Sequence, residues 1–442
     1  MGVGGIGMSG IAALLMRHGY TVSGSDLSSS ESVKQLERIG VKVYLGHHAS
    51  NVAGAELVVH SSAIRADNPE YLAAFENKIP LIPRAEMLAE LMRLKYGIAV
   101  AGAHGKTTTT SMISLALMEG GLDPTIVVGG RMDNFGGTNA RLGNSEFMVV
   151  EADESDGSFN KLSPCIAVVT NMDREHMDFY GTMRKVKSAF TEFLNKVPFY
   201  GLSVLCADDP YLRALQHRVL RRKRTYGFRD GSDYQVVDYT PHATGTQCTV
   251  MALGHREKLN LQVPGKHNML NAIAALAVAD ELSIPRERSL KGLAAFQGVQ
   301  RRFQKRGEKG GVHFIDDYAH HPSEIAATLL AARERFGNAK IRVVFQPHRY
   351  SRVEDLFDQF SKCFTHCDGV AITDIYAAGE TPIPGIDSEG LVESLRRQGQ
   401  ADAFYTPKPL AGIELWLKQS VPGDVIFTLG AGDLPNVYHH LF

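Results

Sequence analysis

The chain has 442 residues, with 47 Lys and Arg against 48 Asp and Glu, and 44% of its residues are hydrophobic. Because domains usually span about 100–200 residues, this length predicts two or three of them. The balanced charge excludes a strongly basic chain, and we expect no nucleic-acid and no membrane partner. No apolar run is long enough to cross a bilayer and no secretion signal is evident, so we expect a cytoplasmic protein.

The first 94 residues alternate in the pattern of β-α-β units. A glycine-rich start, GVGGIGMSG, leads into a helical stretch at residues 11–18 and a short strand at residues 20–23. ELVVHSSAI and KIPLIPR predict two further strands, and LAELMRLKYG predicts a closing helix. Such alternation is typical of a parallel sheet covered by helices.

The glycines at the start of the chain form a weak ligand-binding motif. Gly2, Gly4 and Gly7, with Asp26 after the next strand, resemble a dinucleotide-binding fingerprint. In that fingerprint the glycine backbone approaches a pyrophosphate and the acid binds a ribose hydroxyl, which does not distinguish NAD from UDP. The motif should follow a strand, yet only Met1 precedes Gly2. We therefore expect the first strand of this domain to be missing.

A second unit opens with a buried strand at residues 98–101, which runs into AGAHGKT at residues 101–107 and then a helix. Backbone N–H groups of such a loop point at phosphate oxygens, its lysine neutralises them, and its hydroxyl reaches Mg²⁺. The loop is shorter than the usual phosphate loop, because Val100 stands where the first glycine belongs. A tight turn with a surface lysine is the alternative interpretation.

Polar segments follow the next two apolar strands. VEADESD at residues 150–156 offers carboxylates at a strand end, where they can contact Mg²⁺ beside the phosphate loop. A solvated acidic loop is the alternative for this segment. TNMDREHMD at residues 170–178 contains His176, which can be either a metal ligand or a helix-cap residue.

The rest of the chain predicts more strands. Residues 234–263 alternate in type around QCTVMAL and LNLQVPG, which predicts antiparallel strands attached to the main sheet. Beyond residue 300, HFIDDYAHHP, IRVVFQPHRYSR, GVAITDIYAAGE and DVIFTLGAGD each predict an apolar strand that ends in polar residues. Ligands of open α/β sheets bind at such carboxyl ends.

We therefore expect an α/β protein with three domains. The first, residues 1–94, would be Rossmann-like. The second, residues 95–299, would hold a parallel sheet of the P-loop ATPase type. The third, residues 300–442, would again be Rossmann-like.

The five cysteines are Cys165, Cys206, Cys248, Cys363 and Cys367. An odd number excludes complete disulfide pairing within one chain. Cys363 and Cys367 flank His366, but a metal site there would lack further clustered ligands. We expect simple thiols.

Taken in order, the motifs resemble the Mur ligase family over the whole chain. AGAHGKTTTT resembles that family's ATP loop. The family's later motifs resemble, in order, the segments VEADESD, TNMDREHMD, GKHNMLNA, GVQRRF, DDYAHHP, QPHRYSR and GAGD. GVGGIGMSGIA, SGSD and SSAI resemble the UDP-binding domain of the branch that uses UDP-N-acetylmuramate and L-alanine. EADESD and QPHRYSR favour that branch over the related ligase that attaches a recycled murein tripeptide to the same sugar, which is kept as the alternative.

The resemblance implies a cytoplasmic enzyme of peptidoglycan synthesis, either a monomer or a weak homodimer. Its first domain would bind the UDP-sugar, its central domain ATP and Mg²⁺, and its third domain the amino acid. ATP would phosphorylate the lactyl carboxylate of UDP-N-acetylmuramate to an acyl phosphate. The amine of L-alanine would then displace phosphate.

The resemblance also implies site residues, transferred motif by motif. Those expected to carry the chemistry are Lys106, His176, Arg302 and His320. ATP would be bound by Gly102, Ala103, His104, Gly105, Lys106, Thr107, Thr108, Asn268, Asn271 and Asp317. The UDP-sugar would be bound by Gly4, Gly5, Gly7, Met8, Ser9, Asp26 and Ser62. His348, Arg349 and Tyr350 would line the alanine and lactyl site, and Thr107, Glu151 and His176 would bind metal.

Alternatives remain for single residues. Asn268 and Asn271 could cap the apolar helix that follows them, and QPHRYSR could be a solvated basic loop. Several members of the family carry a carbamylated lysine after the His176 motif, but spacing assigns that role to neither Lys185 nor Lys187.

Two other classes of protein share parts of the pattern. A nicotinamide dehydrogenase would explain the glycine fingerprint but leaves AHGKTTTT without a purpose. A non-catalytic nucleotide switch would explain the phosphate loop, but not a third domain with His and Arg at its strand ends.

Overall fold

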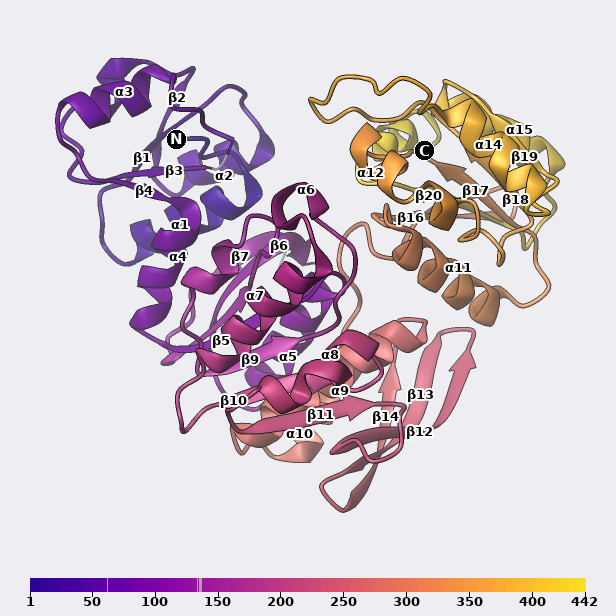
Figure 1. The fold of residues 1–442 in the computed structure, drawn as a ribbon, viewed down its shortest axis with the longest axis horizontal. Helices are drawn as coiled ribbons and strands as arrows, with labels where there is room; N and C mark the ends of the chain where they lie inside the picture. The colour runs from indigo at the N-terminus through magenta and orange to yellow at the C-terminus, as the bar shows by residue number, and fades with distance from the viewer. Residues whose placement is uncertain (62, 133, 135–136) are drawn as a thin grey trace. The chain divides into compact units, whose positions relative to one another are not determined.

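The computed structural model describes residues 1–61, 63–132, 134 and 137–442 (Figure 1). Its contacts divide the chain into two compact units. The first unit comprises Met1–Asp238, Cys248–Leu259 and Leu270–Phe296, and the second comprises Tyr239–Gln247, Asn260–Met269 and Gln297–Phe442. Among the described residues, no helix is both long enough and apolar enough to cross a membrane.

The first unit begins with two parallel strand pairs, β1 with β2 and β3 with β4. Residues 1–3 lie between the pairs. The amino group of Met1 donates to the carbonyl of Val59 at 2.8 Å, while the N–H groups of Gly2 and Val3 donate to the carbonyl of Ser25. The elements here are α1 (Ile6–Arg17), β1 (Ser23–Asp26), α2 (Glu31–Arg38), β2 (Lys42–Leu45), β3 (Val58–His60), α3 (Pro69–Glu76), β4 (Leu81–Pro83) and α4 (Arg84–Arg93).

Two boundaries predicted in this region were wrong. Helix α1 starts at Ile6 rather than residue 11, and β1 starts at Ser23 rather than residue 20. Glycines weaken helix propensity, which hides the first turns of α1 from a sequence pattern. Tertiary packing requires them there: a Cβ on Gly7 would lie 2.9 Å from Nη1 of Arg84, and one on Gly10 would lie 3.0 Å from Cβ of Ala140.

A ten-stranded sheet forms the centre of the first unit, in the order β14-β13-β12-β11-β10-β9-β5-β8-β6-β7. The inner strands β5 (Tyr96–Ala101), β8 (Phe147–Glu151) and β9 (Ile166–Val169) are parallel and almost fully buried. Its other elements are α5 (Lys106–Glu119), β6 (Thr125–Met132), β7 (Thr138–Arg141), α6 (Met177–Tyr180), α7 (Met183–Asn195), β10 (Leu202–Cys206), α8 (Pro210–Leu215), β11 (Lys223–Gly227), β12 (Tyr234–His242), β13 (Gly245–Ala252), β14 (His255–Leu261), α9 (Lys266–Glu281) and α10 (Arg286–Ala294).

The strand order reverses at β5, and this reversal positions a site. The chain that follows β5 adds strands on the β8 side first and then crosses to β9 and β10 on the other side. At such a switch point the loops leaving neighbouring strands part and open a crevice at the carboxyl ends. The loops after β5, β8 and β9 therefore meet at one edge of the sheet.

The strands predicted for residues 234–263 are attached to the main sheet, as expected. β12, β13 and β14 follow one another through two-residue connections, which join antiparallel neighbours. β12 continues the sheet by pairing in parallel with β11.

The second unit contains a six-stranded sheet in the order β15-β16-β20-β17-β18-β19. The four strands predicted beyond residue 300 are β16, β20, β17 and β18, and the pattern missed the edge strands β15 and β19. Its elements are β15 (Gln304–Lys309), β16 (Val312–Asp317), α11 (Pro322–Phe336), β17 (Ile341–Phe345), α12 (Tyr350–Asp355), α13 (Phe357–Phe360), β18 (Gly369–Ile372), α14 (Ser388–Arg397), β19 (Ala403–Tyr405), α15 (Pro409–Gln419) and β20 (Val425–Leu429).

Alternating side chains cover both faces of this second sheet. Val343 and Phe427 pack with residues of α11, α12, α13 and α14 in one core. Their strand neighbours Val344 and Ile426 point the other way and pack with Trp416 of α15 in a second core. A sheet buried on both faces reads as a continuous apolar run, which is why these strands could be predicted.

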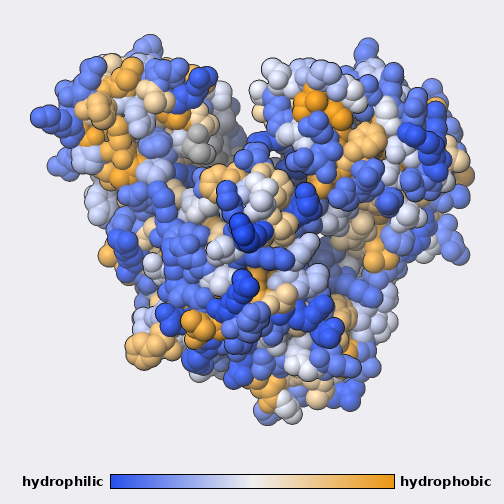
Figure 2. All heavy atoms as spheres, viewed as in Figure 1, coloured by the Kyte–Doolittle hydropathy of each residue, from blue (hydrophilic) through white to orange (hydrophobic). Residues whose placement is uncertain are grey.

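The surface and the cysteines are ordinary for such a fold. Hydrophilic residues cover most of the face drawn in Figure 2, and hydrophobic residues form separate patches on it. All five cysteines are free thiols, as predicted. Within the described ranges, no group of potential metal ligands includes Cys363 or Cys367.

A buried carboxylate ties the strand pairs of the N-terminal region together. Glu70 of α3 is only 1% exposed. It accepts hydrogen bonds from Ser25 at 2.5 Å and Asn51 at 2.6 Å, and its Oε2 lies 3.1 Å from Nδ1 of His47. Burial by itself raises the pKa of Glu70, but the hydrogen bonds from Ser25, Asn51 and His47 outweigh it and leave the pKa below its usual value of 4.5.

We predict that Glu70→Gln lowers the free energy of unfolding by about 1–3 kcal/mol at pH 7, because the amide cannot accept the same set of charge-assisted bonds. A carboxyl whose pKa is lower in the folded state stabilises fully above its unfolded pKa and loses this effect as pH falls through the folded pKa. The difference between variant and parent should therefore shrink below about pH 4.5. Urea unfolding at several pH values measures it.

The control is Glu76→Gln, which removes an exposed carboxylate from the same helix. It should change the free energy of unfolding by less than about 0.5 kcal/mol. Equal stability of Glu70→Gln and the parent protein at pH 7 would contradict the role given to Glu70.

Candidate active site

The loop between β5 and α5 has the backbone of a phosphate-binding loop. Gly102 has a φ of 135° and Gly105 a φ of 82°, values that favour glycine. A Cβ on Gly102 would lie 2.1 Å from Oγ1 of Thr170, so no other residue fits there. Helix α5 begins at Lys106, directly after the loop, and adds the positive potential of its N-terminus.

The end of β9 holds this loop in place. Asn171 accepts a hydrogen bond from the N–H of His104 at 2.8 Å and donates one to its carbonyl at 3.0 Å. Thr170 donates to the same carbonyl at 2.6 Å. The sequence pattern assigned no role to these two residues, because their contact with the loop depends on the pairing of β5 with β9.

Lys106 is largely buried, with 16% of its side chain exposed, and oxygen atoms surround its ammonium group. Its Nζ donates to the carbonyls of Gly102 at 2.6 Å and Ala103 at 3.1 Å, and to Oε1 of Glu154 at 2.8 Å. Burial lowers the pKa of Lys106, but the Glu154 and Glu151 carboxylates outweigh it and hold the pKa above its ordinary value. The side chain therefore carries a charge inside the site, which excludes the alternative of a surface lysine.

The acidic segment after β8 reaches the same loop. Oε2 of Glu151 accepts from Oγ1 of Thr107 at 2.8 Å and from the N–H of Gly129 at 2.7 Å. Asp153 lies 3.3 Å from Arg84 at the start of α4. The segment is therefore packed against its surroundings rather than freely solvated, and it brings Thr107 beside Glu151. Thr108 is buried behind them.

His176 belongs to a group of potential cation ligands. Each of Glu154, Glu175 and His176 offers one ligand atom, and these three atoms lie within 4.8 Å of one another. His176 occupies the N-cap position of α6, but its side chain makes no capping hydrogen bond. Oε2 of Glu154 is buried and has no hydrogen-bond partner among the described residues. Two carboxylates and an imidazole are ligands that a divalent cation can take, so the residues present fit such an ion.

Asn271 of α9 also lies beside the phosphate loop. A Cβ on Gly105 would lie 2.8 Å from Oδ1 of Asn271, which leaves room only for glycine. Asn268 is one helical turn earlier, and its Nδ2 donates to the carbonyl of Pro264 at 2.7 Å. This bond is not a helix cap, because a capping side chain accepts from a backbone N–H, so it does not decide between the two interpretations of Asn268.

The glycine fingerprint at the start of the chain is braced by Asp26. The N–H of Gly4 donates to Oδ2 of Asp26 at 2.8 Å, and the N–H of Ser28 donates to Oδ1 at 3.2 Å. Gly5 is the N-cap of α1, so this loop also meets a helix N-terminus. Gly7 lies in the first turn of α1, and Met8 and Ser9 are buried. Ser62 lies outside the described residues.

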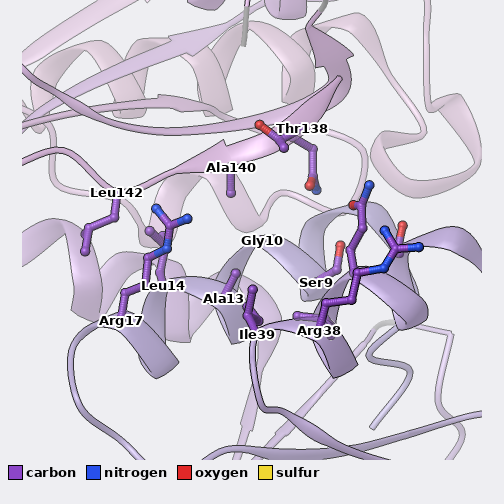
Figure 3. Close-up of a pocket in the computed structure, with 14 residues that line it drawn as sticks. Ser9, Gly10, Ala13, Leu14, Arg17, Arg38, Ile39, Thr138, Ala140 and Leu142 are labelled. Carbon is purple, nitrogen blue, oxygen red and sulfur yellow. The ribbon is translucent and has the colours of Figure 1, made fainter. Parts of the chain in front are cut away.

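A pocket of about 270 Å³ lies along α1, next to α2 and β7 (Figure 3). Ala13 and Ala140 give it an apolar middle, and the Arg17 and Arg38 side chains border it. Of the described residues predicted for the UDP-sugar, Ser9 alone lines it. The sequence did not indicate this pocket, because its walls come from separate elements.

In the second unit, Arg302 and His320 share one carboxylate. Nη1 of Arg302 lies 3.3 Å from Oε1 of Glu324, and Nδ1 of His320 lies 3.2 Å from its Oε2. Asp317 accepts from the N–H groups of Phe303 and Ala319, both at 2.8 Å. Burial raises the pKa of Asp317 to about 6, against the opposing charge of Arg302. The sequence missed Glu324.

The QPHRYSR segment places His348 between aromatic rings. Its ring stacks on Tyr376 with centroids 5.5 Å apart and meets His320 edge-on at 5.9 Å. Burial, together with the positive charges of His320, Arg352 and Arg349, lowers the pKa of His348 to about 4, so the imidazole is neutral near pH 7.

The remaining residues of this segment serve different purposes. Arg349 adopts a φ of 68°, unusual for a residue with a side chain. Tyr350 packs against the core of the second unit rather than standing free. Arg352, which the sequence did not single out, contacts Nδ1 of His348 at 3.2 Å. A solvated basic loop does not describe these contacts.

Comparisons with known proteins agree with this arrangement. Three family models match: "Mur ligase family, catalytic domain" at residues 1–96, "Mur ligase middle domain" at residues 100–279, and "Mur ligase, glutamate ligase domain" at residues 301–432. The chain is 52% identical over 438 residues to the UDP-N-acetylmuramate–L-alanine ligase of Geobacter sp. strain M21, covering 99% of this chain and 95% of that protein. It is 54% identical over 440 residues to the ligase of the same name from Acidobacterium capsulatum, again covering 99% and 95%.

Solved structures show the same relationship. The crystal structure of the UDP-N-acetylmuramate–alanine ligase of Thermotoga maritima matches with a TM-score of 0.83 and 32% identity, covering 99% of this chain and 96% of that one. A murein peptide ligase of Psychrobacter arcticus matches with a TM-score of 0.71 and 23% identity, covering 100% and 96%, which shows a shared fold. With matching family models along most of its length and relatives at about half identity, the chain belongs to the Mur ligase family.

Proposed function

We propose that the protein joins L-alanine to the lactyl carboxylate of UDP-N-acetylmuramate at the expense of ATP, in peptidoglycan synthesis. The observation that carries this proposal is the largely buried Lys106, paired with Glu154, in a glycine loop beside the Thr107–Glu151 pair. Relatives with that printed name cover nearly the whole chain at about half identity. We expect the reaction to take place in the cytoplasm, where ATP is available.

The reaction needs two displacements. An oxygen of the lactyl carboxylate attacks the γ-phosphorus of ATP, the bond to the bridging oxygen of ADP breaks, and an acyl phosphate forms. The amine of L-alanine then attacks the acyl carbon, phosphate leaves with the electrons of the C–O bond, and the amine gives up a proton. Negative charge gathers on the phosphoryl group in the first step, so cationic groups and N–H donors lower its barrier.

Residues of the first unit would stabilise that charge. The N–H groups of the loop from Gly102 to Thr108 and the N-terminus of α5 would face the phosphates. Lys106 would contact the γ-phosphate. Asn271, beside Gly105, and Asn268 would lie near the adenine.

The chain offers residues that would hold Mg²⁺, and the ion would supply positive charge that offsets part of the negative charge of the phosphates. Thr107 and Glu151, which are hydrogen-bonded to each other, would hold one ion. His176 would serve a second. Neither Lys185 nor Lys187 is needed for this assignment.

The N-terminal region would hold the UDP-sugar. The glycine loop that Asp26 braces would receive the pyrophosphate, with Gly4, Gly5, Gly7, Met8 and Ser9 closest to it. Asp26 accepts from two backbone N–H groups of this region, so its first contribution is to fix the loop.

The second unit would supply the amino-acid site and further cations. Arg302 and His320, positioned by Glu324, would contact the acyl phosphate or ATP, with Asp317 holding the backbone around them. His348 and Arg349 would line the alanine site, where a guanidinium suits the α-carboxylate.

The related ligase that adds a recycled murein tripeptide is the second candidate. A structure of that type shares the fold at 23% identity. The alanine ligases are about twice as similar in sequence, which favours a single amino acid as acceptor.

We predict that phosphate release from ATP requires both UDP-N-acetylmuramate and L-alanine. Lys106→Ala should lower this rate by a factor of about 10²–10³ or more, because an isolated positive charge at the transferring phosphoryl group is lost. A coupled phosphate assay measures both effects. The same assay with the murein tripeptide in place of L-alanine separates the two candidate functions.

Lys161→Ala is the matched control. Lys161 is half-exposed in the same unit and pairs with Glu86. This variant should keep normal turnover. Because Lys106→Ala leaves Glu154 buried without its partner, its thermal unfolding should be compared with that of Lys106→Met. Near-normal turnover in both folded variants would contradict the assignment.

We predict that His348→Ala raises the KM for L-alanine about tenfold or more while the KM for ATP changes little. The reason is that His348 is held by Tyr376 and Arg352 in the segment assigned to the amino acid. Initial rates with each substrate varied in turn give both constants. A rise confined to the KM for ATP would place His348 at the nucleotide instead.

A further inference from the structure

Glu154 is a buried carboxylate that the proposed reaction leaves without a role. It is 3% exposed, and it lies between Lys106 and His176. Its Oε1 is 2.8 Å from Nζ of Lys106 and 3.8 Å from Nε2 of His176. Its Oε2 is buried without a hydrogen-bond partner in the described part of the chain.

Glu154 belongs to a group of side chains that can take a cation. Glu154, Glu175 and His176 each offer one ligand atom, and these atoms lie within 4.8 Å of one another. An unpaired buried carboxylate oxygen is costly, so a partner is expected for it. A divalent cation coordinated by two carboxylates and an imidazole would supply one.

Lys106 is occupied by the protein itself in this arrangement. Its three contacts are the carbonyls of Gly102 and Ala103 and the carboxylate of Glu154. An ammonium group has three donors, so all of them are in use. Lys106 has to give up some of these contacts before it can bind a phosphate.

We infer that Glu154 couples cation binding to nucleotide binding. It holds Lys106 against the loop until a divalent cation binds among Glu154, Glu175 and His176, and the cation then frees Lys106 for the phosphates of ATP. This inference rests on the proposed function, because it assumes that the loop receives ATP.

Simple electrostatics gives the coupling its sign. A divalent cation on Glu154 weakens the attraction between that carboxylate and Lys106 and repels the ammonium toward the phosphates. In the absence of a cation, Glu154 competes with the phosphates of ATP for Lys106, and its charge repels the anionic nucleotide. Removing its charge should therefore weaken cation binding and strengthen binding of metal-free ATP, two effects of opposite direction.

The test compares Glu154→Gln with the parent protein by two binding measurements that do not depend on turnover. Mn²⁺ binding to the nucleotide-free protein is followed by electron paramagnetic resonance. ATP binding in the presence of EDTA is followed by calorimetry. We expect Glu154→Gln to bind Mn²⁺ about tenfold more weakly and to bind metal-free ATP several-fold more tightly, in the range usual for coupled sites.

Two further variants separate coupling from a structural role. Glu175→Gln removes a cation ligand that makes no hydrogen bond to Lys106, so it should weaken Mn²⁺ binding and change the affinity for metal-free ATP less than Glu154→Gln does. Asp156→Asn removes an exposed carboxylate from the same loop and should change neither affinity.

Two results would overturn the inference. One is unchanged affinity of Glu154→Gln for both ligands. The other is a parallel loss of both affinities with normal folding, which would make Glu154 a structural support of the loop. Failure of the proposed function is a separate outcome: phosphate release would then not depend on UDP-N-acetylmuramate and L-alanine, whatever these binding measurements show.

Discussion

The ammonium of Lys106, a positive charge largely withdrawn from solvent, is the constraint on which the candidate active site depends. A charge in a protein interior is costly unless oxygen atoms surround it. Two loop carbonyls and Glu154 do so here, while Glu151 adds a second negative charge nearby. These oxygens stand in for the phosphates that the site is proposed to receive, so the loop keeps its shape without them.

The sheet brings these groups together, although they are far apart in the sequence. Lys106 follows β5, Glu151 ends β8, and Asn171 follows β9, and these strands are neighbours in the ten-stranded sheet. Parallel pairing aligns their carboxyl ends at one edge. The second unit repeats the principle: Asp317 ends β16 and Gln346 follows β17, and both strands flank β20.

In both units, carboxylates hold neighbouring charged or polar side chains in position. Glu324 holds Arg302 and His320 in the second unit, as Glu154 holds Lys106 in the first. Glu70 binds Ser25 and Asn51 in the N-terminal region. Each acid is almost fully buried, so each fixes side chains that would otherwise sample several rotamers.

The sequence alone determined the α/β class, most of the strands and the motifs of the Mur ligase family, because buried parallel strands leave continuous apolar runs and glycines mark loops that approach phosphate. It did not determine the start of α1, since glycines weaken helix propensity and the side chains packed against Gly7 and Gly10 come from distant segments of the chain. Nor did it assign roles to Glu154, Glu324 or Tyr376. Their partners are Lys106, Arg302 and His348, and no local pattern encodes which side chains meet across different strands and helices; tertiary packing decides it.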